Sequence, residues 1–296
     1  MLKFAGRIPK PSVVRVPLPK ALIAAALLAL AAAPSAAAAD TASSSNWAGY
    51  AVHRAGVRFT KVVGSWTQPS ATCVAGKQGY SAIWLGLGGF AQSSNALEQI
   101  GSEVDCTAAG KVSSSAWYEL VPAASRPIGM KVKPGDALSA TVSVTGHRVV
   151  LSLVDSTSHR SFKKVLQASV VDVSSAEWIL EAPSDCISAT SCQTLPLADF
   201  GSANFAQSRA QSVSGHVGSI SDRAWGATKI QLRPSGRRFV VLNGSGPTVG
   251  TATPSALNPR GTSFTVAYSP APVQATQSLA ARTTAVRAGQ LVHPRR

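Results

Sequence analysis

Short runs of β-branched and aromatic residues, in which apolar and polar positions mostly alternate, recur along the middle of the chain. Turn-forming residues separate these runs, and no long stretch keeps a helical period. The expected strands lie at 59–67, 80–88, 96–104, 113–120, 137–144, 147–155, 176–182, 197–205, 229–232, 238–243 and 262–269. Thr145 and Gly146 suit a two-residue hairpin turn between two of them. The pattern predicts an all-β fold, a single antiparallel β-sandwich of two packed sheets.

The two ends of the chain differ from this middle part. The first 20 residues carry five basic residues and no acid, an apolar run follows at 21–33, and small residues lead up to Ala39. This order predicts a cleaved secretory signal peptide at 1–39, because the apolar run is shorter than the roughly 20 residues of a membrane span. Residues 270–296 contain Pro, Ala and Arg without an acid and are interpreted as a disordered tail. We expect a domain at 40–269, secreted to the extracellular space, with no stable membrane insertion after cleavage.

The net charge of +15 and the isoelectric point near 10.3 first suggest nucleic acid as a partner. Five of the basic residues belong to the predicted signal peptide and four to the tail, which leaves +6 on the domain. Basic residues of the domain are scattered, and the closest run, Arg160, Lys163 and Lys164, is interpreted as a solvated loop. We therefore expect no nucleic-acid partner and a monomeric protein.

Four cysteines, Cys73, Cys106, Cys186 and Cys192, lie in the predicted secreted domain. An even number of cysteines in an oxidising compartment predicts two disulfides. Three pairings are possible, and proximity in the sequence favours Cys73–Cys106 and Cys186–Cys192. A zinc site is the rival interpretation, but the close Cys-x-x-Cys pairs of such sites are missing. We expect neither a metal nor a cofactor.

Two common kinds of hydrolase lack support in the sequence. No G-x-S-x-G motif is present to hold a nucleophilic serine. Asp155 follows an apolar strand, as the catalytic aspartates of aspartic peptidases do, but Thr157 stands where their turn needs glycine. A second copy of the turn, which would complete a carboxylate pair, is also missing. Asp155 is therefore interpreted as a turn residue.

Several polar side chains fall inside the expected strands. Period-two alternation places Glu177 and Glu181 on one face of their strand, and Trp117 and Glu119 on one face of theirs. Gln99 shares a strand face with small and apolar residues. A solvated sheet face would explain the paired acids equally well, so the pattern alone leaves both interpretations open.

Seven motifs and a following segment occur in an order that resembles the glutamic peptidase (eqolisin) family, in its bacterial secreted branch. They are SSNWAGY (44–50), GSWTQPS (64–70), SAIWLGLGG (81–89), LEQIGSE (97–103), AWYEL (116–120), VKPGD (132–136) and AEWILEAP (176–183), followed by LADFGSANF (197–205). The resemblance implies a lectin-like or jelly-roll sandwich with a concave face that binds protein or peptide substrates.

The resemblance also implies a catalytic pair, which falls on Gln99 and Glu181. Glu181 as a carboxylate would deprotonate a water and then return the proton to the leaving amine. Gln99 would donate hydrogen bonds to the developing oxyanion. A glutamate with an ordinary pKa of about 4.3 works best in acid, so an acidic optimum is expected. Such an endopeptidase needs no aspartate pair and should be insensitive to pepstatin.

Five further residues take supporting or substrate-binding positions by the same resemblance: Trp47, Trp84, Trp117, Glu119 and Glu177. Each tryptophan could equally be core packing. The chain departs from the family at Gly88, where the motif W-V-G-I-D-G has an aspartate, and this puts the pH optimum and substrate preference in doubt. Only a few residues separate Ala39 from SSNWAGY, so a long inhibitory propeptide is not expected.

A non-catalytic module is the alternative function. In it the three tryptophans would line a groove for carbohydrate or a cell-wall polymer, and either Gln99 or Glu181 could be replaced without loss of ligand affinity. An endopeptidase requires both.

Overall fold

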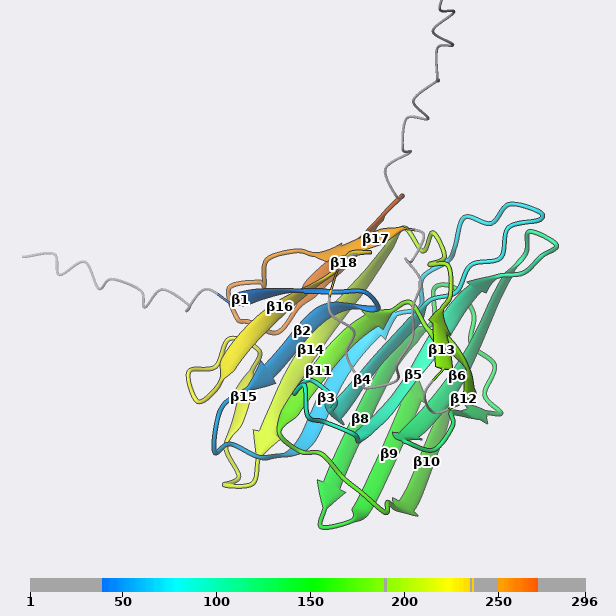
Figure 1. Cartoon of the computed structure of the whole chain (residues 1–296). Helices are drawn as coiled ribbons and strands as arrows, with labels where there is room; N and C mark the ends of the chain where they lie inside the picture. The colour runs from blue at the N-terminus through cyan, green and yellow to red at the C-terminus, as the bar shows by residue number, and fades with distance from the viewer. Residues whose placement is uncertain (1–38, 189–190, 235, 237–249, 271–296) are drawn as a thin grey trace, which may run out of the picture. The chain divides into compact units, whose positions relative to one another are not determined.

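A computed structural model describes residues 39–188, 191–234, 236 and 250–270, all within one compact unit (Figure 1). These residues form strands and contain no helix, and so none that could cross a membrane. The strands are β1 (Asp40–Ser44), β2 (Trp47–His53), β3 (Phe59–Thr67), β4 (Ala82–Gly88), β5 (Leu97–Cys106), β6 (Val112–Val121), β7 (Arg126–Ile128), β8 (Ala137–Thr145), β9 (Arg148–Asp155), β10 (Arg160–Gln167), β11 (Ser175–Glu181), β12 (Ser184–Ser188), β13 (Ser191–Thr194), β14 (Ser202–Ser212), β15 (Val217–Ser219), β16 (Gly226–Leu232), β17 (Thr251–Pro254) and β18 (Phe264–Ser269).

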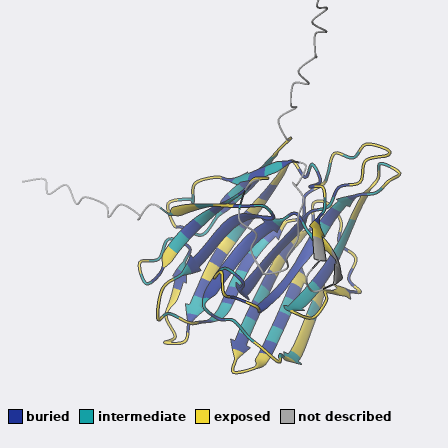
Figure 2. Cartoon of the chain, viewed as in Figure 1, coloured by how far each residue is buried: buried dark blue, intermediate teal, exposed yellow. Residues whose placement is uncertain are grey.

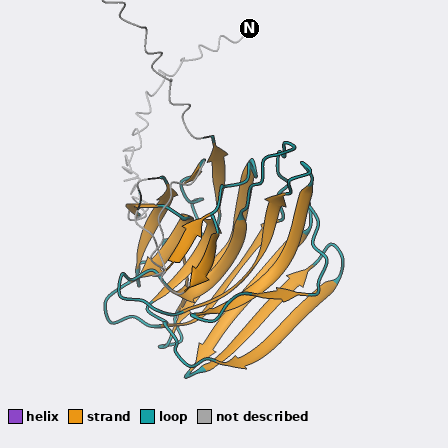
Figure 3. Ribbon diagram, turned by 45° about the vertical axis from the view of Figure 1, so that its right-hand side comes forward, coloured by secondary structure: helices purple, strands orange, loops and turns teal. Residues whose placement is uncertain are grey.

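One continuous path of hydrogen-bonded strands makes both layers of the domain. Its order is β10-β9-β8-β3-β14-β18-β17-β16-β2-β11-β4-β5-β6-β7, and β12 with β13 forms a separate hairpin. The two halves of the path pack face to face, since β3 contacts β4 and β11, and β8 contacts β4 and β5 (Figure 3). The predicted antiparallel β-sandwich is confirmed, and the ladder runs unbroken from one layer into the other. The pairing of β1 with β16 is parallel.

The two layers differ in how they are buried (Figure 2). Strands β3, β8 and β14 mostly alternate between buried and more exposed positions, as expected when one face meets the core and the other meets water. Strands β2, β4 and β11 are buried at nearly every position. Their second face carries its own apolar cluster, which includes Trp47, Trp84, Trp117 and Ile179. This second face is where the candidate site lies.

Most of the expected strands are present, with three corrections. The basic run at Arg160–Lys164 is part of strand β10 rather than a loop, because it pairs along its whole length with β9. The turn between β8 and β9 consists of Gly146 and His147, one residue later than predicted, because Thr145 already pairs with Arg148. The expected strand at 197–205 begins only at Ser202, and the one at 238–243 lies outside the described residues.

The disulfide Cys73–Cys106 is formed, as predicted, and ties the segment before β4 to the end of β5. Backbone pairing places Cys186 opposite Cys192 in the hairpin of β12 and β13. The side chains of these two cysteines lie outside the described part, so their bond stays a prediction. Nearly all of the predicted signal peptide and tail also lie outside it.

Candidate active site

Three rows of cross-strand neighbours build the candidate site on the second face of β2, β11, β4, β5 and β6, called here the site face. Directly paired residues point to the same face of a sheet. The first row joins Trp47, Glu181 and Ala82, and the second joins Trp84, Ile179, Gly101 and Trp117. The third row joins Glu177, Gly86, Gln99 and Glu119. Because Ala82, Trp84 and Gly86 alternate along β4, all three rows share one face.

Glu181 ends β11 and is held by two hydrogen-bond donors. The side-chain amide of Asn46 donates to Oε1 at 3.1 Å, and the indole N–H of Trp84 donates to Oε2 at 2.8 Å. Burial raises the pKa of Glu181 to about 7, even though these donors favour the charged form. The negative charge of Glu119 raises that pKa further, and the indole of Trp47 offsets part of the rise. The carboxyl group can therefore both lose and regain a proton near neutral pH, as a general base and acid must.

Gln99 lies two strands from Glu181 on the site face and is almost fully buried. Its amide nitrogen donates to Oε2 of Glu119 at 2.6 Å, while its carbonyl oxygen accepts no hydrogen bond from the described residues. Burial raises the pKa of Glu119, although the bond from Gln99 lowers it in part. Glu119 thus fixes which way the Gln99 amide points, and its negative charge also raises the pKa of Glu181. The carbonyl oxygen of Gln99 is thus a buried acceptor without a partner among the described residues.

The three predicted tryptophans all lie on the site face, and all are buried there. Trp47 and Trp84 meet edge to face, with ring centroids 5.0 Å apart. Trp84 therefore has two roles, packing within the apolar cluster and donating to Glu181. The sequence left open whether each tryptophan packs in the core or serves the site. Trp84 does both.

Glu177 faces the same side as Gln99 but is fully buried, which removes the interpretation of a solvated acid. Its pKa is raised well above the usual range, mainly by burial, and the charges of Asp172 and Glu98 raise it further. The side chain of Glu98 is also 0% exposed. Neither carboxyl group has a well-formed hydrogen bond within the described residues, although the backbone N–H groups of Asp172 and of Glu98 lie near enough to favour the charged form of Glu98 in part. Both groups are therefore most stable in their neutral form.

Gly88 stands where the resembling family has an aspartate, and an acid from another segment lies beside it. A Cβ atom at Gly88 would lie 2.5 Å from the main-chain oxygen of Asp172 and 2.6 Å from its Cβ. The φ angle of Gly88 is +87°, which also favours glycine. The carboxylate of Asp172 accepts hydrogen bonds from the backbone N–H of Gly89 at 3.2 Å and from the Ser94 hydroxyl. The connection between β10 and β11 therefore brings a carboxylate to this end of β4.

Residues 45–247 match the sequence model of the peptidase A4 family. The chain belongs to the peptidase A4 family. The resemblance to the glutamic peptidases, also called eqolisins, is thus confirmed, and the protein is a peptide hydrolase of this glutamic type.

Solved structures of this peptidase A4 fold resemble the domain closely in architecture. A crystal structure of scytalido-glutamic peptidase with a peptide-based transition state analog has a TM-score of 0.58 at 23% identity, covering 76% of this chain and 98% of that one. SCP-B, an eqolisin in a complex with the tripeptide Ala-Ile-His, gives 0.56 at 21%, covering 76% and 98%. Aspergilloglutamic peptidase from Aspergillus niger gives 0.51 at 24%, covering 64% and 99%. At these identities the likeness shows the fold. No curated protein matches the chain.

Two contributors to the site of this peptidase A4 domain were not predicted. Asn46 precedes Trp47 within the motif SSNWAGY, and its side-chain amide donates to Glu181. Its place in a family-like motif was the sequence signal that could have identified it. Asp172 had no local signal, because it lies 83 residues beyond Gly89 in the sequence. In the described part of the chain, no group of three or more His, Cys, Asp or Glu side chains is arranged to hold a metal ion.

Proposed function

We propose that the protein is a secreted endopeptidase of the bacterial eqolisin branch, in which Gln99 and Glu181 activate a water to hydrolyse peptide bonds. The observation that carries this proposal is the environment of Glu181. Its carboxyl group is fixed by Asn46 and Trp84, and burial raises its pKa to about 7. A perturbed carboxyl group with oriented donors is typical of a catalytic acid or base.

The reaction begins with a water held between the Glu181 carboxylate and the Gln99 carbonyl oxygen. Glu181 takes a proton as the water oxygen attacks the carbonyl carbon of the substrate. The Gln99 amide, oriented by Glu119, then donates to the oxyanion that forms. Glu181 returns its proton to the nitrogen as the C–N bond breaks, so the group ends in its starting state. No covalent intermediate is needed.

The pH dependence follows from the same carboxyl group. The acidic optimum expected from the sequence assumed an ordinary glutamate, whereas burial moves the pKa of Glu181 to about 7. The ionised base is therefore scarce in strong acid, and the optimum moves toward weakly acidic to neutral pH. Glu119 contributes to this position, because its negative charge raises the pKa of Glu181.

Hydrolysis of an unfolded protein by the mature chain tests the proposal. Wild type should cleave it in the presence of pepstatin, while Glu181→Gln and Gln99→Ala should lose activity. The matched control is Gln211→Ala on β14, which lies outside the site face. Full activity in both site variants would refute the assignment. Potent inhibition by pepstatin would instead indicate catalysis by aspartates.

A further inference from the structure

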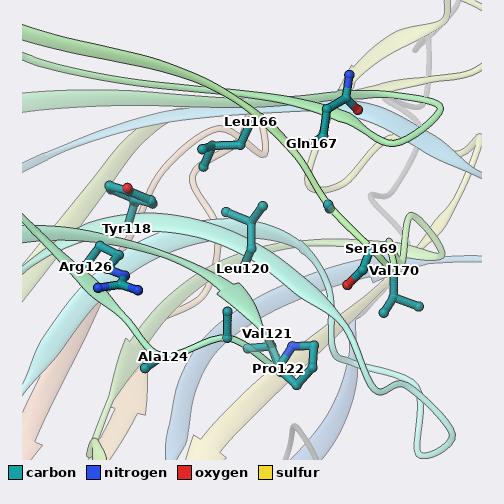
Figure 4. A pocket seen from close by; sticks show the side chains of 12 residues that line it. Tyr118, Leu120, Val121, Pro122, Ala124, Arg126, Leu166, Gln167, Ser169 and Val170 are labelled. Carbon is teal, nitrogen blue, oxygen red and sulfur yellow. The ribbon is translucent and has the colours of Figure 1, made fainter.

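A groove of about 450 Å³ opens where the two ends of the strand path meet, and its lining includes neither Gln99 nor Glu181. Its walls come from the turn after β6 and from the end of β10, and include Tyr118, Leu120, Val121, Arg126, Leu166 and Val170. In Figure 4 the side chains of Leu120 and Leu166 point toward one another across the hollow, and Arg126 lies beside Tyr118. The groove is therefore apolar inside, with one cation at its wall.

Two unpaired sheet edges border this groove. Strands β7 and β10 are the last strands of the path, and each is hydrogen-bonded to one neighbour among the described strands, β6 and β9. Arg126 belongs to β7, and Leu166 and Gln167 belong to β10. Free N–H and C=O groups along such edges are suited to pairing with an added extended strand.

The strands at the two ends of the path, β6 with β7 and β10, contact each other at one place and are separated at the groove. Tyr118 of β6 stacks on Phe162 of β10, with ring centroids 5.7 Å apart and an interplanar angle of 22°. Beyond this contact the walls separate around Leu120 and Leu166. Val170 is 39% exposed at the far wall, so apolar surface there is open to a ligand.

The charge of the groove selects among possible ligands. Arg126 is the one charged residue of the lining, it is exposed, and it forms no ion pair within the described residues. A guanidinium beside an apolar wall favours a carboxylate next to apolar side chains. The tail at 270–296 carries four arginines and no acid, so it lacks the charge that Arg126 would attract.

We propose that this groove is a secondary binding site for an extended polypeptide segment in which an Asp or Glu lies next to apolar residues. The segment would add as a strand at the edge of β7 or β10, with its carboxylate on Arg126. The identification of this polypeptide as substrate rests on the proposed peptidase function. The turn that forms one wall also provides the Ser125 N–H that bonds Glu119, so the bound segment lies against the support of Gln99.

Binding is measured with the full chain carrying Glu181→Gln, so that the ligand is not cleaved. The probe is a fluorescent ten-residue peptide of alternating Val and Thr with one central Glu, compared by anisotropy with the same peptide carrying Gln. We expect Arg126→Gln to weaken the Glu peptide about two- to fivefold and to leave the Gln peptide unchanged. Arg209→Gln, an exposed arginine on β14, is the matched control.

The apolar wall and the sheet edges are tested separately. Val170→Asp should weaken both peptides, whereas Val217→Asp, an exposed valine on β15, should weaken neither. A backbone N-methylated Glu peptide should bind more weakly than its parent, because it cannot pair with an edge strand. Equal binding of the methylated peptide would overturn the added strand.

Other outcomes also decide the proposal. Unchanged binding in Arg126→Gln, or an equal loss for both peptides, would overturn it. A control chain has its four tail arginines replaced by glutamine. If this replacement weakened binding of the Glu peptide as much as Arg126→Gln does, the proposal would also be overturned. With the active protein, Arg126→Gln should raise KM for an acidic unfolded protein and leave kcat unchanged. Arg126-dependent binding by a chain without hydrolytic activity would refute only the peptidase function, and hydrolysis without Arg126 dependence would refute only the groove.

Discussion

Glu98 is a buried acid without a counter-charge, and it makes the stability of the fold depend on pH. It lies beside Gln99 on β5 and is 0% exposed. Burial raises its pKa to about 8, and the charge of Asp172 adds to the rise. The backbone N–H groups of Asp172 and of Glu98 itself offset part of it. Glu177, the other fully buried acid nearby, feels the charge of Glu98 in turn.

The size and sign of the effect follow from the two pKa values. A rise from 4.5 to about 8 corresponds to about 5 kcal/mol, at about 1.4 kcal/mol per pH unit. The folded state holds the proton more tightly than the unfolded state. The stabilisation is therefore complete below about pH 4.5 and is lost as the pH rises to about 8. Since small proteins are stable by only about 5–15 kcal/mol, the folded state should weaken markedly as the pH rises from about 4.5 to about 8.

The variant Glu98→Gln keeps the shape of the side chain and removes its proton. Urea unfolding, followed by tryptophan fluorescence at pH 4.5, 6, 7 and 8, gives the free energy of unfolding at each pH. We expect the two proteins to be similar at pH 4.5 and the variant to be more stable by about 3–5 kcal/mol at pH 8. Both carry Glu181→Gln to prevent self-digestion.

Two results would refute this reasoning. One is a free energy of unfolding that stays flat in the parent protein from pH 4.5 to 8. The other is an equal fall in the parent and in Glu98→Gln. Asp185→Asn, which replaces an exposed carboxyl group on β12, serves as the control and should change the free energy by less than about 0.5 kcal/mol.

Three further predictions concern the site and its frame. Glu119→Gln removes a negative charge near Glu181 and should lower the pKa of Glu181, which moves the acid limb of the kcat/KM profile to lower pH. An acid limb at the wild-type pH would contradict the effect of Glu119 on Glu181. Replacing Cys73 and Cys106 together by alanine opens a cross-link between residues 33 apart and should cost about 3–4 kcal/mol in urea unfolding, and an unchanged midpoint would contradict this. Gly88→Asp should destabilise the fold by several kcal/mol, because the new Cβ meets a main-chain oxygen of the β10–β11 connection at 2.5 Å; a fully stable variant would show that this connection yields easily.

The alternating strands were predictable because one face of each meets water. Strand β3 was placed at its observed bounds from FTKVVGSWT, where apolar and polar residues alternate. Strand β2 was missed because WAGYAVH is buried on both faces and shows no alternation. Strand β10 was missed for the opposite reason, since RSFKKVLQ is a largely exposed edge strand that resembles a solvated loop.

The site could be predicted as far as residue types and strand faces. Period-two alternation and the family motifs placed Glu177 and Glu181 on one face, which the pairing of β11 confirms. Their different environments were not readable. Glu177 is sealed inside the domain, while Glu181 is partly exposed and held by donors from other strands. Such contacts depend on how distant segments pack, as the position of Asp172 beside Gly88 also shows.

The turnover of Glu181→Gln on an unfolded protein, relative to Gln211→Ala at the wild-type pH optimum, tests the central claim most directly. The substitution keeps the size of the side chain and removes the base, and the one remaining oxygen can still accept from either Asn46 or Trp84. We predict a fall in kcat of about a hundredfold to ten-thousandfold, the range of general acid–base catalysis, with the fold intact by circular dichroism. A folded Glu181→Gln protein with the turnover of the control would contradict the account.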